Sequence, residues 1–197
     1  MTKLTLIDSP VANVANIARA LRAAGASLEV TGDPEAIGRA GKLVLPGVGS
    51  FIAAMSWLVE NHIDTAIHAA VGKGASLLGI CVGHQLLFDT SYEMGRTRGL
   101  GLVRGDVQPF DGAFPVPQIG WNRVAARGPL FEGVENEVFY FVNSYAVREA
   151  PDEVARADYG LPFTAAVQHE RVFGVQFHPE KSSHAGMRVL RNFVAWT

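Results

Sequence analysis

The stretch Ser76-Leu77-Leu78-Gly79-Ile80-Cys81-Val82-Gly83-His84-Gln85-Leu86-Leu87-Phe88 decides the fold of this 197-residue chain. Its first five residues form a short apolar run, which is typical of a strand buried on both faces. Gly79 to Gly83 follow the pattern Gly-x-Cys-x-Gly, the cysteine form of the sharp strand-to-helix turn called a nucleophile elbow. We therefore expect a buried strand, a tight turn at Cys81 and a helix.

Cys81 is a candidate nucleophile because of its place in this turn. At the N-terminus of the following helix, unpaired backbone N–H groups and the helix dipole favour a thiolate over a thiol. Cys81 is also the only cysteine in the chain. This excludes an internal disulfide and fits a reducing compartment. A buried structural cysteine remains the alternative at this point.

The composition indicates one ordinary globular domain over residues 1–197. The chain is 48% hydrophobic and carries 17 basic and 19 acidic residues, for a net charge of −2. No block of like charges suggests a nucleic-acid surface or a polybasic membrane patch. The apolar run at the start is too short for a signal peptide, and no run reaches transmembrane length. We expect a soluble, cytoplasmic protein.

Strands and helices alternate through the first half of the chain. Apolar runs predict strands at 4–7, 28–30, 43–45 and 76–80. Helical spacing of apolar residues predicts helices that follow Ser9 or Asn13 as a cap, begin near Phe51, and cover about 62–71. Gly32-Asp33-Pro34 is expected to end the strand at 28–30. This alternation predicts an α/β fold with a doubly wound, open twisted sheet and helices on both faces.

From about Tyr92 the sequence is rich in glycine and proline. Short pieces such as 101–104 suggest antiparallel strands and loops inserted into the same domain. Further strands are predicted at 138–142 and 172–177, and a closing helix at 185–196.

His178 is the histidine most suited to act as the base for a cysteine nucleophile. Pro179 favours an extended conformation at His178, and in extended chain residues i and i+2 project to the same side. Glu180 can then orient the ring, which leaves its other nitrogen free to face a thiol. The alternative is a strand that ends in a turn with two exposed polar residues. The other histidines are expected to be scaffold, to face away from the sulfur, or to lack a purposeful carboxylate partner: His62, His68, His84, His169 and His184.

The loop Pro46-Gly47-Val48-Gly49 is a candidate oxyanion site. Two glycines around one residue allow the peptide at Val48 and Gly49 to rotate and to point an N–H at a developing negative charge. The backbone N–H of Val82, which follows the nucleophile, would be the second donor. A phosphate cradle or a plain tight turn are the alternatives, although no Lys-Ser/Thr pair accompanies the loop.

These three pieces, in this order, resemble the class I glutamine amidotransferases over essentially the whole chain. Within that class the chain is most similar to the glutaminase subunits of imidazole glycerol phosphate synthase, through segments 45–51, 99–102, 116–122, 140–145 and 174–182. Those subunits commonly have histidine at the positions of Gln118 and Asn143, and often methionine at that of His84.

The resemblance implies a flavodoxin-like mixed sheet and a Cys-His-Glu triad. Cys81 would attack the side-chain amide of glutamine, His178 would transfer the proton, and Glu180 would orient His178. Further roles are implied for residues that bind glutamine or lie at the ammonia exit: Gln85, Ser144 and Tyr145 for the substrate, and Tyr145 and Lys181 for the exit. Ammonia would pass into a (β/α)8-barrel cyclase subunit, with which the chain would form a heterodimer in histidine biosynthesis. No metal or organic cofactor is expected.

Three alternatives stay open from the sequence. One is a paralogous amidotransferase subunit that feeds another ammonia acceptor. The second is a cysteine hydrolase that needs no partner. The third, a non-catalytic interaction subunit, is disfavoured because a binding module has no need of the complete set Cys81, His178 and Glu180.

Overall fold

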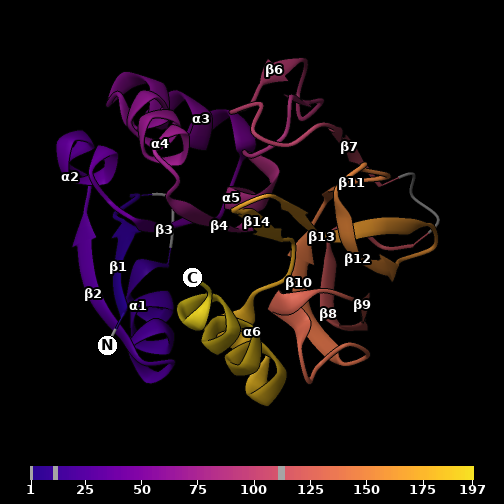
Figure 1. Ribbon diagram of the computed structural model, residues 1–197. Helices are drawn as coiled ribbons and strands as arrows, with labels where there is room; N and C mark the ends of the chain where they lie inside the picture. Colours follow the sequence, from indigo (N-terminus) through magenta and orange to yellow (C-terminus); the bar gives the residue numbers. More distant parts are fainter. Residues whose placement is uncertain (1, 11–12, 111–113) are drawn as a thin grey trace.

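The computed structural model describes residues 2–10, 13–110 and 114–197, which form a mixed α/β fold (Figure 1). The helices are α1 (Val14–Ala23), α2 (Pro34–Gly38), α3 (Phe51–Glu60), α4 (Ile63–Gly72), α5 (Val82–Gln85) and α6 (Ser183–Ala195), with 3-10 turns η1 (Pro129–Phe131) and η2 (Pro179–Lys181). The strands of the first half are β1 (Thr2–Ile7), β2 (Ala26–Thr31), β3 (Lys42–Gly47), β4 (Ser76–Cys81), β5 (Thr90–Ser91) and β6 (Thr97–Arg98). Those of the second half are β7 (Asp106–Pro109), β8 (Gln118–Arg123), β9 (Ala125–Ala126), β10 (Val138–Asn143), β11 (Tyr145–Val147), β12 (Glu153–Asp158), β13 (Pro162–His169) and β14 (Val172–Val175).

The main sheet is parallel at one side and largely antiparallel at the other. Its strand order is β2-β1-β3-β4-β14-β13-β11-β7-β5-β6, with β12 and β9 attached to β13. The neighbours from β2 to β14 are all parallel, whereas β13 pairs with β14 in the antiparallel sense. A separate antiparallel pair, β8 and β10, stands beside this sheet. The predicted open sheet is confirmed. The glycine- and proline-rich region supplies only β6 and β7 of its antiparallel part, and β9, β11, β12 and β13 of that part come from residues 125–169.

Helices cover both faces of the parallel strands, as predicted. α1 and α6 lie together on one face, while α2, α3, α4 and α5 lie on the other (Figure 1). Within the described residues no helix combines the length and hydropathy that a membrane span requires.

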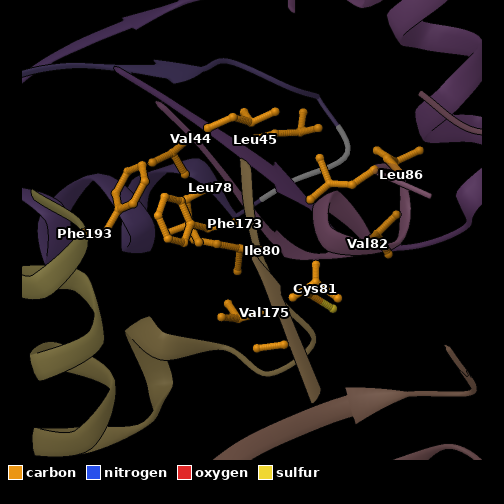
Figure 2. Packing of buried hydrophobic residues seen from close by; sticks show 14 of the residues in the cluster. Val44, Leu45, Leu78, Ile80, Cys81, Val82, Leu86, Phe173, Val175 and Phe193 are labelled. Carbon is orange, nitrogen blue, oxygen red and sulfur yellow. The ribbon is translucent and has the colours of Figure 1, made fainter. Parts of the chain in front are cut away.

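β4 is the buried centre of this arrangement. Every residue of the strand is buried, and Leu77, Leu78 and Ile80 are at most 1% exposed. Figure 2 shows this strand's side chains between those of β3 and β14, with Phe193 of α6 on one side and Leu86 beyond α5 on the other. A two-faced buried strand explains why the run 76–80 is continuously apolar.

Two helix starts follow directly from side-chain caps. Asn13, rather than Ser9, caps α1 by accepting a hydrogen bond from the backbone N–H of Asn16. Asp33 caps α2 by accepting from the N–H groups of Glu35 and Ala36, and Pro34 occupies the first turn. The prediction that Gly32-Asp33-Pro34 ends the second strand is confirmed, because β2 ends at Thr31, but the helix that begins there was not predicted. An Asp-Pro pair is also a helix start.

Other sequence-based boundaries need correction. The helix after Cys81 has only four residues. Residues 101–104 are not a strand, and β14 ends at Val175, before the predicted 177. β12 and β13 were not predicted, although β12 pairs with β13 and β13 with β14 across short connections. Their sequences contain alanine, charged residues and a proline, which are depleted in strands, so propensity does not indicate them.

Candidate active site

Cys81 lies at the end of β4 in a strained backbone conformation. Its φ of 57° and ψ of −112° place a non-glycine residue at positive φ, outside the regions that side chains ordinarily occupy. The flanking glycines explain how so sharp a turn fits. A Cβ atom on Gly79 would stand 2.5 Å from the carbonyl oxygen of Gly83, and one on Gly83 would stand 2.0 Å from that of Leu45. Both positions therefore exclude a side chain.

The loop before α3 has two glycines with different roles. Gly47 belongs to β3, and a Cβ atom there would stand 2.7 Å from the backbone nitrogen of Gly83. Its small size is needed for the approach of α5, a role that the sequence did not indicate. Its role in rotation of the loop peptide stays a prediction. Gly49 has a φ of 82° and open space around it. The conformational freedom of the loop therefore lies at Gly49.

His178 and Glu180 form a buried pair. The Nδ1 atom of His178 lies 2.9 Å from Oε1 of Glu180, and their side chains are 5% and 2% exposed. His178 itself is extended, with φ −97° and ψ 97°, but the following residues form the 3-10 turn η2. The turn, not a continued extended chain, brings the carboxylate to the ring, so the physical reason predicted for this contact was wrong.

Burial of the His178 ring disfavours its charged form, but its neighbours favour it more strongly. The Cys81 sulfur, through a side-chain hydrogen bond, and the Glu180 carboxylate raise the pKa of His178 to about 10. The sulfur also lies 3.8 Å from the carbonyl oxygen of Val142. Cys81 and His178, which are 97 residues apart in the sequence, are thus brought into contact by the fold.

These groups face a cavity of about 430 Å³. Its lining contains most of the residues that the sequence singled out: Val48, Gly49, Cys81, Val82, Gln85, Ser144, Tyr145, His178 and Lys181. Glu180 lies behind His178 and does not line it. Four further lining residues were not assigned to the site from the sequence: Glu93, Pro117, Val142 and Asn143. Val142 and Asn143 directly precede the predicted Ser144, and that proximity was the available signal.

Glu93 enters the site through a contact that sequence patterns do not reveal. Its Oε2 atom accepts a hydrogen bond of 2.6 Å from the backbone N–H of Phe51, the first residue of α3. This bond ties the segment after β5 to the loop that carries Val48 and Gly49. The two segments are more than 40 residues apart, so no local spacing indicates their contact.

The amide of Gln85 is held from two sides. Its Nε2 atom donates to the carbonyl oxygen of Tyr145 at 3.0 Å and to Oε1 of Gln176 at 2.9 Å. Asn143 donates to the same Tyr145 oxygen at 3.0 Å. Gln118 lies opposite Asn143 across the β8–β10 pair and is also buried.

The remaining histidines do not line the cavity. His84 is fully buried against Phe88, and burial lowers its pKa to about 3. Two exposed histidines have carboxylate neighbours outside the cavity: His169 lies 3.2 Å from Asp152, and His184 lies 3.9 Å from Glu137.

Solved structures share this fold over nearly the whole chain. PurLQS from Thermotoga maritima aligns with a TM-score of 0.78 and 20% identity over 98% of each chain. A structure described as a glutamine amidotransferase aligns with a TM-score of 0.77 and 19% identity, over 96% of each chain. At such identities the likeness concerns the fold alone.

Sequence relatives are considerably more similar. The imidazole glycerol phosphate synthase subunit HisH of Geobacillus thermodenitrificans is 44% identical over 98% of this chain and 96% of its own length. The subunits of the same name from Moorella thermoacetica and Caulobacter vibrioides are 42% and 40% identical, over 98% and 100% of this chain and 94% and 99% of their own lengths. The family model for glutamine amidotransferase class-I matches residues 5–196. The chain belongs to the class I glutamine amidotransferase family.

Proposed function

We propose that the chain is the glutaminase subunit of an imidazole glycerol phosphate synthase, and that it passes ammonia to a cyclase subunit in histidine biosynthesis. The observation that carries this proposal is one cavity that holds the strained Cys81 next to the buried pair of His178 and Glu180. The assignment to this synthase is supported by relatives that are all named as its HisH subunit and are 40–44% identical over nearly the whole chain.

The chemistry follows from nucleophilic catalysis by a thiolate. Sγ of Cys81 attacks the side-chain amide carbon of glutamine, and the carbonyl oxygen becomes an oxyanion. The backbone N–H of Val82 and the peptide at Val48 and Gly49 donate to that oxygen. His178 then gives its proton to the amide nitrogen, the C–N bond breaks, and ammonia leaves.

Water completes the cycle. His178, now neutral, takes a proton from a water molecule that attacks the glutamyl thioester. The C–S bond breaks, glutamate leaves, and the thiolate of Cys81 beside a charged His178 is restored. Glu180 holds the ring in place through both halves of the reaction and stabilises its charged form.

The rest of the cavity suits the two ends of glutamine. Among the lining residues of the described chain, Glu93 is the one carboxylate, and we assign the α-ammonium group to it and to Oε1 of Gln85. The backbone around Ser144 and Tyr145 holds the remainder of the substrate. Tyr145 and Lys181 stand at the ammonia exit, where Nζ of Lys181 lies 5.9 Å from the ring centroid of Tyr140.

An exposed apolar face beside the cavity supports a partner at that exit. Ile119 and Trp121 of β8 are 64% and 54% exposed, and they lie opposite Val142 and Tyr140 of β10 in the strand register. Cross-strand neighbours share a face, and Val142 also lines the cavity. Exposed contiguous apolar surface marks interaction sites. We assign this face to the (β/α)8-barrel cyclase subunit of a heterodimer.

The test combines the full chain with the cyclase subunit of the same organism. Ammonia and glutamate are measured from glutamine, together with the cyclised product, using Cys81→Ala as the control. Coupled formation of that product supports the proposal. Binding of the chain to a different ammonia-using enzyme of that organism, in place of the cyclase subunit, would instead indicate a paralogous subunit. Full glutaminase activity without any partner would indicate an independent hydrolase.

A further inference from the structure

We propose that Gln176, which does not line the cavity, is a positioning residue that determines which atom of the Gln85 amide faces the substrate. It holds that amide so that an acceptor oxygen, and not an N–H group, meets the α-ammonium group of glutamine. This inference rests on the proposed function.

Gln176 is fixed in the interior immediately after β14. It is fully buried, and its backbone N–H donates to the carbonyl oxygen of Ala165 in β13 at 2.9 Å. Its side-chain Oε1 accepts the hydrogen bond from Nε2 of Gln85 at 2.9 Å. The side chain of Gln176 therefore contacts Gln85, which lines the cavity, from the side that faces away from the cavity.

The hydrogen-bond partners fix the orientation of the Gln85 amide. The carbonyl oxygen of Tyr145, 3.0 Å away, can only accept, so the nitrogen of Gln85 must face it. Its second N–H is directed to Gln176, which must then present its own oxygen. Both N–H groups of Gln85 are used within the protein. What remains for the substrate is Oε1, which can only accept.

The Gln176 side chain leaves one of its own polar atoms unpaired in this orientation. Its own Nε2 atom is buried and has no hydrogen-bond partner among the described residues. A buried unpaired donor is costly and uncommon. The cost is explained if the oxygen of Gln176 is required toward Gln85, because turning the Gln176 amide over would place two donors against each other.

The consequence concerns recognition of the amino group. Gln85 and Glu93 both line the cavity. With Nε2 of Gln85 engaged by Tyr145 and Gln176, its Oε1 and the carboxylate of Glu93 are the acceptors that we assign to a cation. Without the Gln176 oxygen, only the bond to Tyr145 restrains the Gln85 amide. The amide can then turn and present an N–H group, which repels an ammonium group. Loss of Gln176 should therefore weaken binding of substrates in proportion to their need for the α-ammonium contact.

The test compares L-glutamine with glutaramate, the same molecule without the amino group. Each ligand's affinity is measured by its protection of Cys81 against alkylation by iodoacetamide, using the full-length chain. In Gln176→Met, which is similar in shape but accepts poorly, we expect half-protection by L-glutamine to require about tenfold more ligand or above, as for a hydrogen bond to a charged group. The value for glutaramate should change by less than about twofold, which is below 0.5 kcal/mol.

A conservative variant supplies the rescue. Gln176→Glu keeps a carboxyl oxygen at the position of Oε1, and it should restore the L-glutamine value to within about threefold of wild type. Gln176→Asn shortens the side chain by one methylene and so moves the oxygen away from Gln85. This variant is used in place of Gln176→Met if the melting temperature shows that Gln176→Met does not fold.

The outcomes separate the two levels of the proposal. If both ligands weaken equally, or neither does, Gln176 does not select for the ammonium group and the inference is overturned. If L-glutamine fails to protect Cys81 in the wild-type chain, the proposed glutaminase function itself is wrong.

Discussion

The Nδ1 atom of His178 lies 2.9 Å from Oε1 of Glu180, and the hydroxyl of Ser182 holds the turn that makes this contact. Oγ of Ser182 donates to the carbonyl oxygen of His178 at 2.7 Å and accepts from the backbone N–H of Tyr140 at 2.9 Å. The turn η2 is thus anchored to β10, the strand that leads to the cavity. With Nδ1 engaged by Glu180, the other ring nitrogen is left for the sulfur of Cys81.

Removing the sulfur should lower the pKa of His178. The Cys81 sulfur and the Glu180 carboxylate together raise this pKa to about 10 against the opposing effect of burial. In Cys81→Ala one raising cause is lost and burial remains, so the ring should lose its proton at lower pH than in the wild type. The measurement is an NMR titration of the His178 ring. An unchanged or higher pKa in the variant would show that the two side chains do not interact.

The three triad positions should differ in severity. Cys81→Ala should abolish glutamine hydrolysis while the fold and partner binding persist, and ammonium salts should still support the partner's reaction. His178→Ala should be comparably severe, and Glu180→Gln milder, because an orienting residue contributes less than the base it positions. Steady-state glutaminase rates in the complex provide the measurement. Activity of Cys81→Ala within about tenfold of wild type, or roughly 1.4 kcal/mol of barrier, would exclude Cys81 as the nucleophile.

His84 should make the protein less stable in acid. Burial lowers its pKa to about 3, and both ring nitrogens are buried without hydrogen-bond partners among the described residues. As pH falls below about 6.5, the unfolded chain binds a proton there that the folded chain does not. The free energy of unfolding should then fall by up to about 1.4 kcal/mol per pH unit from this residue.

His84→Met removes that dependence while it fills a similar volume. Urea denaturation at pH 7, 6 and 5 should show a shallower loss of stability for the variant than for wild type. The matched control is His68→Gln, at an exposed position of α4, which should keep the wild-type slope. Parallel slopes for wild type and His84→Met would contradict the prediction.

Much of this site was predictable because several of its interacting residues lie close together in the sequence. The turn at Cys81 needs glycine two residues away on both sides, and Glu180 reaches His178 within one turn, so both features can be identified from the residues alone. Glu93 and Gln176 were not identifiable in this way. Their partners, Phe51 and Gln85, are distant in the sequence, and only the folded sheet brings them together.

The same contrast applies to the fold. The parallel strands β1, β3 and β4 are largely buried and strongly apolar, so their sequence pattern predicts them. β12 and β13 pair with their neighbours in the sequence, but their alanine, proline and charged residues have low strand propensity, and propensity was a weak guide there. Gly47 illustrates this difference. The sequence indicated its possible role in peptide rotation, but not that its small size lets α5 approach β3.

Gly83 should tolerate no side chain. A Cβ atom there would stand 2.0 Å from the carbonyl oxygen of Leu45, a backbone atom that cannot move away cheaply. Gly83→Ala should destabilise the fold by more than about 3 kcal/mol, because α5 must separate from β3. Gly72→Ala is the control: it lies in α4 with open space around it and should be neutral or stabilising by up to about 1 kcal/mol. Thermal unfolding of both variants decides the matter, and similar melting temperatures would refute the prediction.

Gly49 should govern how strongly a partner stimulates glutamine hydrolysis. Hydrolysis without an acceptor wastes glutamine, so a subunit that feeds a partner benefits from being slow alone. Two orientations of the peptide at Val48 and Gly49 would aim either a carbonyl or an N–H at the oxyanion, and only the second completes the site with Val82. Loss of one such donor typically costs about 10²–10³ in rate. A partner would then act by favouring the competent orientation.

Gly49→Val tests this directly. Gly49 has a φ of 82° and open surroundings, so valine fits sterically but restricts the backbone. The ratio of glutaminase turnover in the complex with acceptor to that of the isolated subunit should fall. Gly74→Val imposes comparable backbone strain at φ 91°, after α4 and outside the cavity lining, and should leave the ratio unchanged. If wild type itself hydrolyses glutamine equally fast alone and in the complex, the loop is a fixed oxyanion site or a plain turn, because no orientation remains for a partner to select.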